Sequence, residues 1–106
     1  MTIDLRYILV ISLIVVVAYD IYDDRLRDKA RRLLMRYGLS RISKSVYAGR
    51  ISWESAKEIA FKLSKILKGD DSAVVIPVSE KDFLRAIAVS ENAIAERRPS
   101  GVYVVG

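Results

Sequence analysis

The sequence contains no cysteine and no histidine. Without cysteine, the chain can form neither a disulfide bond nor a thiolate metal site. The absence of histidine removes the commonest general base of enzymes and the usual ligand of zinc and copper. Any chemistry must therefore use carboxylates, hydroxyls, amines or a bound ion. An ion held by carboxylates alone would be a hard cation such as Mg²⁺ or Mn²⁺.

The composition is that of a small, basic, folded protein. Its 106 residues fit one domain with a core of modest size, and a hydrophobic content of 52% excludes a disordered chain. Eighteen basic residues against 13 acidic ones give a net charge of +5. This charge favours a polyanionic partner, and a basic protein with no such partner is the alternative until the charges are located.

The first apolar stretch is uncharged from Tyr7 to Tyr19. It is shorter than the roughly 18 to 20 residues that are needed to span a bilayer. Behind Arg6 it resembles the hydrophobic region of a signal peptide, but no small-residue cleavage motif follows it. We therefore expect a cytoplasmic protein without a membrane partner.

Within this stretch, residues 13–18 (LIVVVA) predict a buried strand that runs into Tyr19 and Asp20. The run is rich in β-branched residues, and its lack of alternation indicates that both faces of the strand are covered. Asp20 then lies where the chain leaves the core and meets water. Such a carboxylate is either a metal ligand or a capping or turn residue, and the composition supports both interpretations equally.

A helix is predicted directly after this strand, from about Asp24 to Tyr37. Asp23 is the expected N-cap, Asp24 suits the positive end of the helix dipole, and Gly38 is the expected stop. Apolar residues recur at helical spacing and form one stripe of Leu26, Ala30, Leu33, Leu34 and Tyr37.

Most remaining positions of this helix are basic, and only Asp28 offers a counter-charge among them. Because the repulsion is largely unrelieved, an anion-facing surface is favoured over a helix face that is simply solvated. The basic residues are Arg25, Arg27, Lys29, Arg31, Arg32 and Arg36.

The rest of the chain alternates further strands with a second helix. Residues 39–51 predict one bent strand, or two short ones with a break at 43–45, and Gly49 is expected to mark a turn or bulge. Ser52 is the expected N-cap of a helix over 53–68. The next segments are a strand over 73–78 with Pro77 near its end or at an edge, and a short helical turn over 80–83. Residues 84–89 predict a strand or a continuation of that helix, and they are followed by a linker over 91–99 and a final strand over 101–106.

This order of elements predicts an α+β fold, the split βαβ pattern of a ferredoxin-like domain with an antiparallel sheet. Two helices cover only one face of such a sheet, so the other face needs a second layer, most simply the same sheet in a two-fold homodimer. We expect an N-terminal extension of unassigned role over 1–12 and the ferredoxin-like domain over 13–90. Residues 91–106 are expected to form a linker and a C-terminal strand that packs on the dimer partner and closes its sheet edge.

The candidate chemistry centres on Asp20 and on the dimer. One carboxylate is a poor site for a divalent ion, but a two-fold axis near the end of the strand would supply a second Asp20. Two such carboxylates beside a polyanion could hold an ion that activates water. Ser45 and Tyr47 either donate hydrogen bonds to phosphates or are structural. The sequence has no Gly-rich phosphate loop, no serine–base pair and no metal-finger spacing.

Several short motifs together resemble the CRISPR-associated Cas2 family of small adaptation proteins, within the superfamily of small ferredoxin-like virulence-associated nucleases. The resemblance implies a ferredoxin-like homodimer in which Asp20 lies by the two-fold axis and can bind Mg²⁺. It implies metal-dependent endonuclease activity on RNA or DNA in some members, and a scaffold role in which the dimer bridges two integrase dimers during spacer acquisition. The motifs are 19–21 (YDI), 23–27 (DDRLR), 37–42 (YGLSRI) and 45–47 (SVY), and the match runs from about Leu13 to Phe83.

The residues that match the family's supporting positions are Tyr19, Arg27, Arg41 and Tyr47, the last of which replaces a frequent phenylalanine. Lys29 stands where arginine is common, and Ser43 stands where glutamine is usual. Lysine keeps the charge of arginine but loses the bidentate contact with phosphate.

Two hypotheses from different classes follow. In the first, the protein is a magnesium-dependent phosphodiesterase in which Asp20 of both subunits binds the metal, while Arg27, Arg41 and Lys29 hold phosphate. In the second, it is a binding scaffold whose basic faces hold duplex DNA between integrase subunits, and Asp20 is dispensable. The scaffold would use Arg27, Arg31 and Arg32. A toxin-type ribonuclease of the same superfamily is a third alternative.

Overall fold

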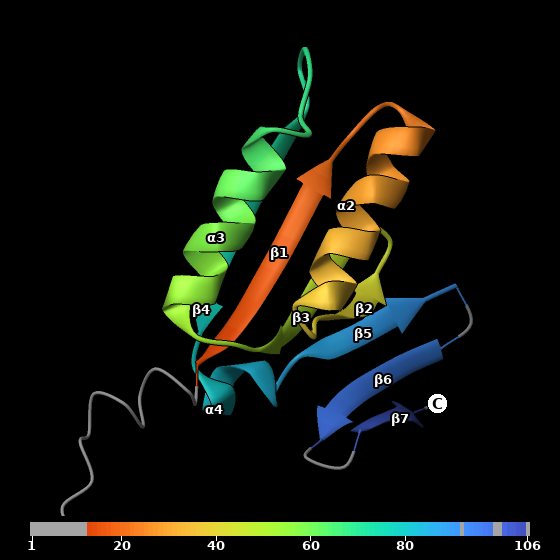
Figure 1. Cartoon of the computed structure of the whole chain (residues 1–106). Helices are drawn as coiled ribbons and strands as arrows, with labels where there is room; N and C mark the ends of the chain where they lie inside the picture. The colour runs from red at the N-terminus through yellow and green to blue at the C-terminus, as the bar shows by residue number, and fades with distance from the viewer. Residues whose placement is uncertain (1–12, 92, 99–100, 106) are drawn as a thin grey trace, which may run out of the picture.

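The computed structural model describes residues 13–91, 93–98 and 101–105, with side chains described for 13–91. Strands β1 (Ile14–Asp20), β2 (Ser40–Ser43), β3 (Val46–Arg50) and β4 (Ser72–Val78) form an antiparallel sheet in the order β2-β3-β1-β4. Helices α2 (Asp24–Arg36) and α3 (Trp53–Ser64) cover one face of this sheet (Figure 1). The predicted ferredoxin-like α+β fold with split βαβ order is confirmed.

Strand β1 lies inside the sheet and separates two different faces. Val15 and Val17 are fully buried beneath the helices. The opposite face, which we call the open face, carries the alternate residues of β1 and β4. Ile14, Ala48 and Phe83 form a small cluster there, whereas Val74 and Ile76 of β4 remain 48% and 41% exposed. The sequence predicted that both faces of β1 are covered. In the single chain only the face under the helices is fully covered. The main core under the helices includes Ala30, Leu33, Leu34, Ala56, Ile59 and Leu63.

The predicted capping residues begin both helices. The Asp23 carboxylate accepts hydrogen bonds from the backbone N–H groups of Arg25 (2.7 Å) and Leu26 (3.1 Å). Ser52 Oγ accepts a hydrogen bond from the N–H of Ser55 (3.0 Å) at the start of α3. A short polar side chain before each helix thus satisfies backbone donors that have no partner within the helix.

Helix α3 ends at Ser64 and not at Lys68 as predicted. The next backbone N–H groups, those of Lys65 and Ile66, bond three residues back, so the chain tightens and leaves the α-helical path. Among the residues that the structure describes, no helix combines the length and the apolar character that crossing a membrane requires.

Strands β2 and β3 are the two short strands that the sequence allowed, and Ser45, with a φ of +63°, lies in the turn between them. The expectation for Gly49 was wrong, because this residue lies inside β3 and marks neither a turn nor a bulge. A Cβ atom at Gly49 would lie 3.0 Å from the carbonyl oxygen of Gly38 and 3.1 Å from the Cα of Leu39. Glycine therefore allows two backbones to approach closely.

A second antiparallel sheet follows the short helix α4 (Glu80–Phe83). It consists of β5 (Ile87–Ser90), β6 (Ala93–Arg98) and β7 (Gly101–Val105), in this order. The linker expected over 91–99 contains strand β6 instead, because its backbone pairs with β5 on one side and β7 on the other. The packing of the C-terminal strand on a dimer partner stays a prediction. The N-terminal extension over 1–12 lies outside the described residues.

Candidate nucleic-acid site

Asp20 is the last residue of β1, and its side chain is exposed. It lies opposite Ser72 of β4, and alternation along β1 places it on the open face with Val16 and Ala18. Within the described part of the chain, the structure shows no hydrogen bond or ion pair to this carboxylate. The same residues contain no group of three or more side chains suited to holding a metal ion. One chain thus presents a single exposed carboxylate at the end of the open face.

The loop after Asp20 is held by Arg27. Its Nη1 donates hydrogen bonds to the backbone carbonyls of Ile21 (2.7 Å) and Tyr22 (2.8 Å), and its Nη2 pairs with the Asp24 carboxylate. The Arg27 side chain is 34% exposed. Because its guanidinium is already engaged, the structure shows Arg27 as a residue that positions the loop carrying Asp20, and phosphate binding by it stays a prediction.

Asp71 holds the same loop from the other side. Its carboxylate accepts hydrogen bonds from the backbone N–H groups of Tyr22 (3.1 Å) and Lys68 (3.0 Å), so it links the loop after β1 to the turn before β4. Asp71 was not among the residues that the sequence singled out. The contact with Tyr22 spans 49 positions, and no local pattern could have revealed it.

Tyr19, Ser45, Tyr47 and Arg41 come together on the helix side of the sheet. The rings of Tyr19 and Tyr47 stack with their centroids 6.1 Å apart, and the backbone N–H of Tyr19 donates to the carbonyl of Ser45 (3.0 Å). Arg41 pairs with Tyr47 across β2 and β3 and therefore shares its face. Since Asp20 lies on the open face, the sheet separates it from Arg41.

The hydroxyl of Tyr19 is kept neutral by its surroundings. Burial raises the pKa of Tyr19, and Tyr47 raises it further, while a hydrogen bond to Ser45 and the charge of Arg41 act in the opposite direction. At neutral pH this hydroxyl can take part in hydrogen bonds but cannot act as a base.

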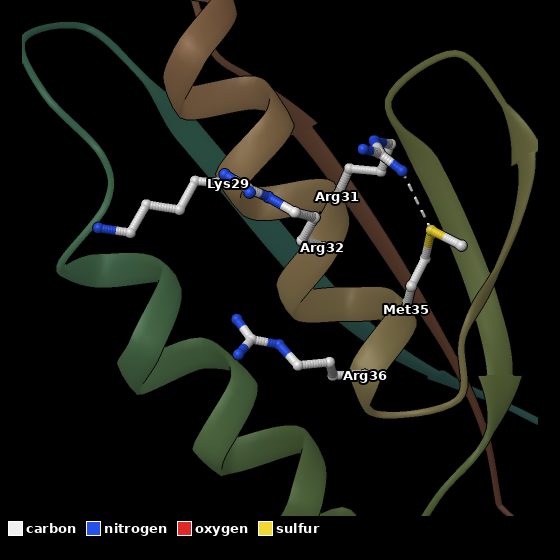
Figure 2. A pocket seen from close by; sticks show the side chains of 5 residues that line it. All are labelled: Lys29, Arg31, Arg32, Met35 and Arg36. Atoms are coloured by element: carbon white, nitrogen blue, oxygen red, sulfur yellow. Dashed lines mark hydrogen bonds between the residues drawn. The ribbon is translucent and has the colours of Figure 1, made fainter.

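Some of the basic residues of α2 are neutralised by Asp28. Its carboxylate forms ion pairs with Arg31 (2.6 Å) and Arg32 (3.3 Å). The hydrogen bond from Arg31 is the main reason why the pKa of Asp28 is lowered, and the same bond raises the pKa of Arg31. Arg31 also contacts the sulfur of Met35 (3.4 Å) and points toward the β2–β3 hairpin (Figure 2).

Other basic residues of α2 are free. Arg25, Lys29 and Arg36 have no ion-pair partner among the described residues. With Arg32 they recur at helical spacing and form one row, which we call the α2 stripe. The stripe covers eleven residue steps, or about 16 Å of helix. Lys29, Arg32 and Arg36 border an open hollow of about 670 Å³ on the surface of α2 (Figure 2).

Comparison with known proteins agrees with this fold. The family model described as "CRISPR associated protein Cas2" matches residues 13–86. The chain belongs to the Cas2 family. The CRISPR-associated endoribonuclease Cas2 of Thermofilum pendens is 43% identical over 74 residues, which make up 70% of this chain and 80% of that protein. A crystal structure of cas2 has a TM-score of 0.61 at 27% identity, and the match covers 76% of this chain and 91% of that chain.

A further Cas2 relative is fused to a second enzyme. The CRISPR-associated endonuclease Cas1/endonuclease Cas2 fusion of Thermoproteus tenax is 37% identical over 62 residues, which make up 58% of this chain and 24% of the fusion. The Cas2 family match extends from β1 through α4 and ends before β5. Asp20, the tyrosine pair and the α2 stripe therefore all lie within the residues that the family model matches, and sheet β5–β7 lies outside them.

Proposed function

We propose that this Cas2 protein is a CRISPR adaptation protein that binds nucleic acid along α2 and, as a two-fold dimer, cleaves it with the help of Mg²⁺. The α2 stripe is the observation that carries the proposal, since three of its four cations lack a partner among the described residues. Phosphates placed along the row would relieve the repulsion between these charges. One strand of a duplex presents a charge about every 3.4 Å along its axis, so a stripe of about 16 Å spans about five phosphates.

The open face supports the dimer. Val74 and Ile76 are 48% and 41% exposed and lie beside Val16 and Ala18 of the neighbouring strand. An apolar sheet face is normally buried against another layer, and a second copy of the same face is self-complementary. Because Asp20 continues this face, a two-fold axis near the end of β1 would bring the carboxylates of both subunits together.

The residues present fit a hard divalent cation when two subunits contribute. An exposed carboxylate is a suitable ligand for Mg²⁺ or Mn²⁺, which take one or two carboxylates together with water and substrate phosphates. Asp20 of both subunits would hold the ion. Such an ion supplies a reactive water near neutral pH and neutralises charge that develops on the phosphate. Arg27 keeps the loop after Asp20 in place, and the α2 stripe holds the nucleic-acid backbone.

We propose a CRISPR integrase subunit as the protein partner of the dimer. In the Thermoproteus tenax relative, a Cas1 endonuclease and a Cas2 endonuclease are joined in one polypeptide. Joining two proteins in one chain is favourable when they work in one assembly, because the linkage raises their effective concentration. The present chain would form the corresponding assembly from separate subunits, with RNA or duplex DNA as its nucleic acid.

The catalytic part of the proposal is tested with Asp20→Asn. Cleavage of RNA and of duplex DNA is measured with and without Mg²⁺, together with binding affinity and melting temperature. We expect the variant to lose the Mg²⁺-dependent cleavage and to keep its fold and affinity, because the substitution is isosteric and the carboxylate has no contact within the described chain. Glu91→Gln is the matched control, since it removes an exposed carboxylate from the turn after β5. Equal cleavage by wild type and Asp20→Asn would exclude the catalytic role.

A non-catalytic scaffold is the second candidate, and the separation of Asp20 from Arg41 across the sheet favours it. In this role the α2 stripe binds duplex DNA between integrase subunits, and Asp20 is dispensable. Replacing Lys29 and Arg36 together by alanine should reduce the salt dependence of binding by about one unit for each lost phosphate contact. An unchanged affinity and an unchanged slope would show that the nucleic acid binds elsewhere.

A further inference from the structure

Tyr22 is exposed to an unusual degree for a residue whose backbone is firmly held. Its side chain is 93% exposed. Its backbone N–H bonds to Asp71 (3.1 Å), and its carbonyl accepts a hydrogen bond from Arg27 (2.8 Å). The ring therefore stands in water on a fixed loop. An aromatic side chain on a fixed backbone offers a large contact area to a ligand and loses the freedom of only two torsions on binding.

The ring of Tyr22 borders a surface hollow of about 630 Å³, which is also lined by Arg25, Leu26 and Lys68. The side chains of Arg25 and Lys68 have no hydrogen-bond or ion-pair partner among the described residues. Two free cations thus flank an exposed aromatic ring.

Three carboxylates also line this hollow, and two of them are already engaged. Asp23 accepts hydrogen bonds from two backbone N–H groups at the start of α2, and Asp71 accepts from two others. Asp70 is exposed, and no described residue binds its carboxylate. The free charges of the hollow are therefore two positive and one negative, a balance that still favours an anionic ligand.

We propose that Tyr22 is a stacking platform for an unpaired base, with Arg25 and Lys68 holding the flanking phosphates. This inference rests on the nucleic-acid binding proposed above and deepens it. Arg25 belongs both to the α2 stripe and to the hollow, so a strand that follows the stripe leads to the ring. Asp20 precedes Tyr22 by two residues, and a base stacked on Tyr22 fixes the strand beside that carboxylate. Because every base has an aromatic face, such a platform selects unpaired nucleotides and tolerates any sequence.

The test compares binding of a labelled single-stranded RNA with binding of a blunt-ended duplex DNA. For Tyr22→Ala we expect about tenfold weaker binding of the single strand, unchanged binding of the duplex and an unchanged salt dependence. Tyr22→Phe should keep the wild-type affinity, because the ring remains. Phe61→Ala is the matched control, since Phe61 is a 64% exposed aromatic with the Lys65 ammonium 5.0 Å from its centroid, on α3 and outside the hollow.

A spectroscopic measurement separates stacking from an indirect effect. Trp53 is the single tryptophan of the chain. Combining Trp53→Phe with Tyr22→Trp moves this fluorophore to the loop. We expect single-stranded RNA to quench its fluorescence and blunt duplex DNA to leave it unchanged.

The outcomes distinguish this inference from the function on which it rests. If wild type binds neither RNA nor DNA, the proposed function fails. If wild type binds both and Tyr22→Ala changes neither, or weakens both equally, the stacking platform is wrong and the proposed function stands. Loss of integrase binding by Tyr22→Ala with intact RNA binding would also overturn the inference, because the ring would then be a protein contact.

Discussion

Replacing Arg27 with alanine tests whether this residue supports a loop or binds phosphate. Its Nη1 donates to two backbone carbonyls at 2.7 and 2.8 Å. Hydrogen bonds from a charged donor contribute about 1.5 to 3 kcal/mol each when buried. Because the side chain is 34% exposed, we take about 2 kcal/mol for the two bonds together. The ion pair with Asp24, whose side chain is 89% exposed, adds little. For a chain of this length, such a loss lowers the melting temperature by roughly 8 to 16 °C.

The assay measures two quantities on each protein, the melting temperature and the salt dependence of duplex binding. Arg27→Ala should melt at a lower temperature than wild type and keep the wild-type salt dependence of duplex binding. Arg36→Ala should melt like wild type, because Arg36 is exposed and unpaired among the described residues, and should lose about one unit of slope. The melting temperature of Arg27→Lys should lie between those of wild type and Arg27→Ala, since a single ammonium replaces a planar guanidinium with several donors.

The reverse pattern would refute the structural reasoning. An Arg27→Ala protein that melts like wild type but loses a full unit of slope would show that this guanidinium binds phosphate and that the loop does not depend on it.

Three further predictions concern packing, pH and assembly. Gly49→Ala should lower the free energy of unfolding in urea by about 1 to 3 kcal/mol, because its Cβ would meet backbone atoms at 3.0 and 3.1 Å. An unchanged free energy of unfolding would show that these backbones can move apart at little cost. When the pH is raised above about 10, the melting temperature of Tyr19→Phe should fall less than that of the wild type. Because the pKa of Tyr19 is raised in the folded protein, its contribution to stability is complete below the ordinary tyrosine pKa of 10.0 and is lost as the pH rises through the folded pKa. Ile76→Asp should turn a dimer into a folded monomer in light scattering, and a monomeric wild type would contradict the proposed dimer.

The elements of the sheet and helices could be predicted because their signals are local. The β-branched run before Asp20 formed β1, and Asp23 and Ser52 capped the helices that follow them. The order of these elements then led to the ferredoxin-like fold. The open face followed from counting layers, since two helices cover one side of a sheet.

The rest depended on contacts that the sequence does not display. Arg27 and Arg36 lie on the same helix with the same side chain, yet one bonds to a loop and the other faces solvent. Asp71 reaches Tyr22 across 49 positions, and Gly49 is required by the backbone of Gly38 and Leu39. Strand β6 joins three apolar residues to three charged ones without the alternation typical of a strand, and it lies between two neighbours, β5 and β7.

The cap of α2 has a consequence for how this protein would distinguish its ligands. The N–H groups of Arg25 and Leu26, which have no backbone partner within the helix, are bonded to the Asp23 carboxylate. These are the groups with which a helix start usually cradles a phosphate in a fixed shape. Nucleic acid bound along α2 as proposed would therefore meet the side chains of the α2 stripe, which bind phosphates and not sugars. Contacts of this kind would leave the choice between ribose and deoxyribose to other parts of the protein.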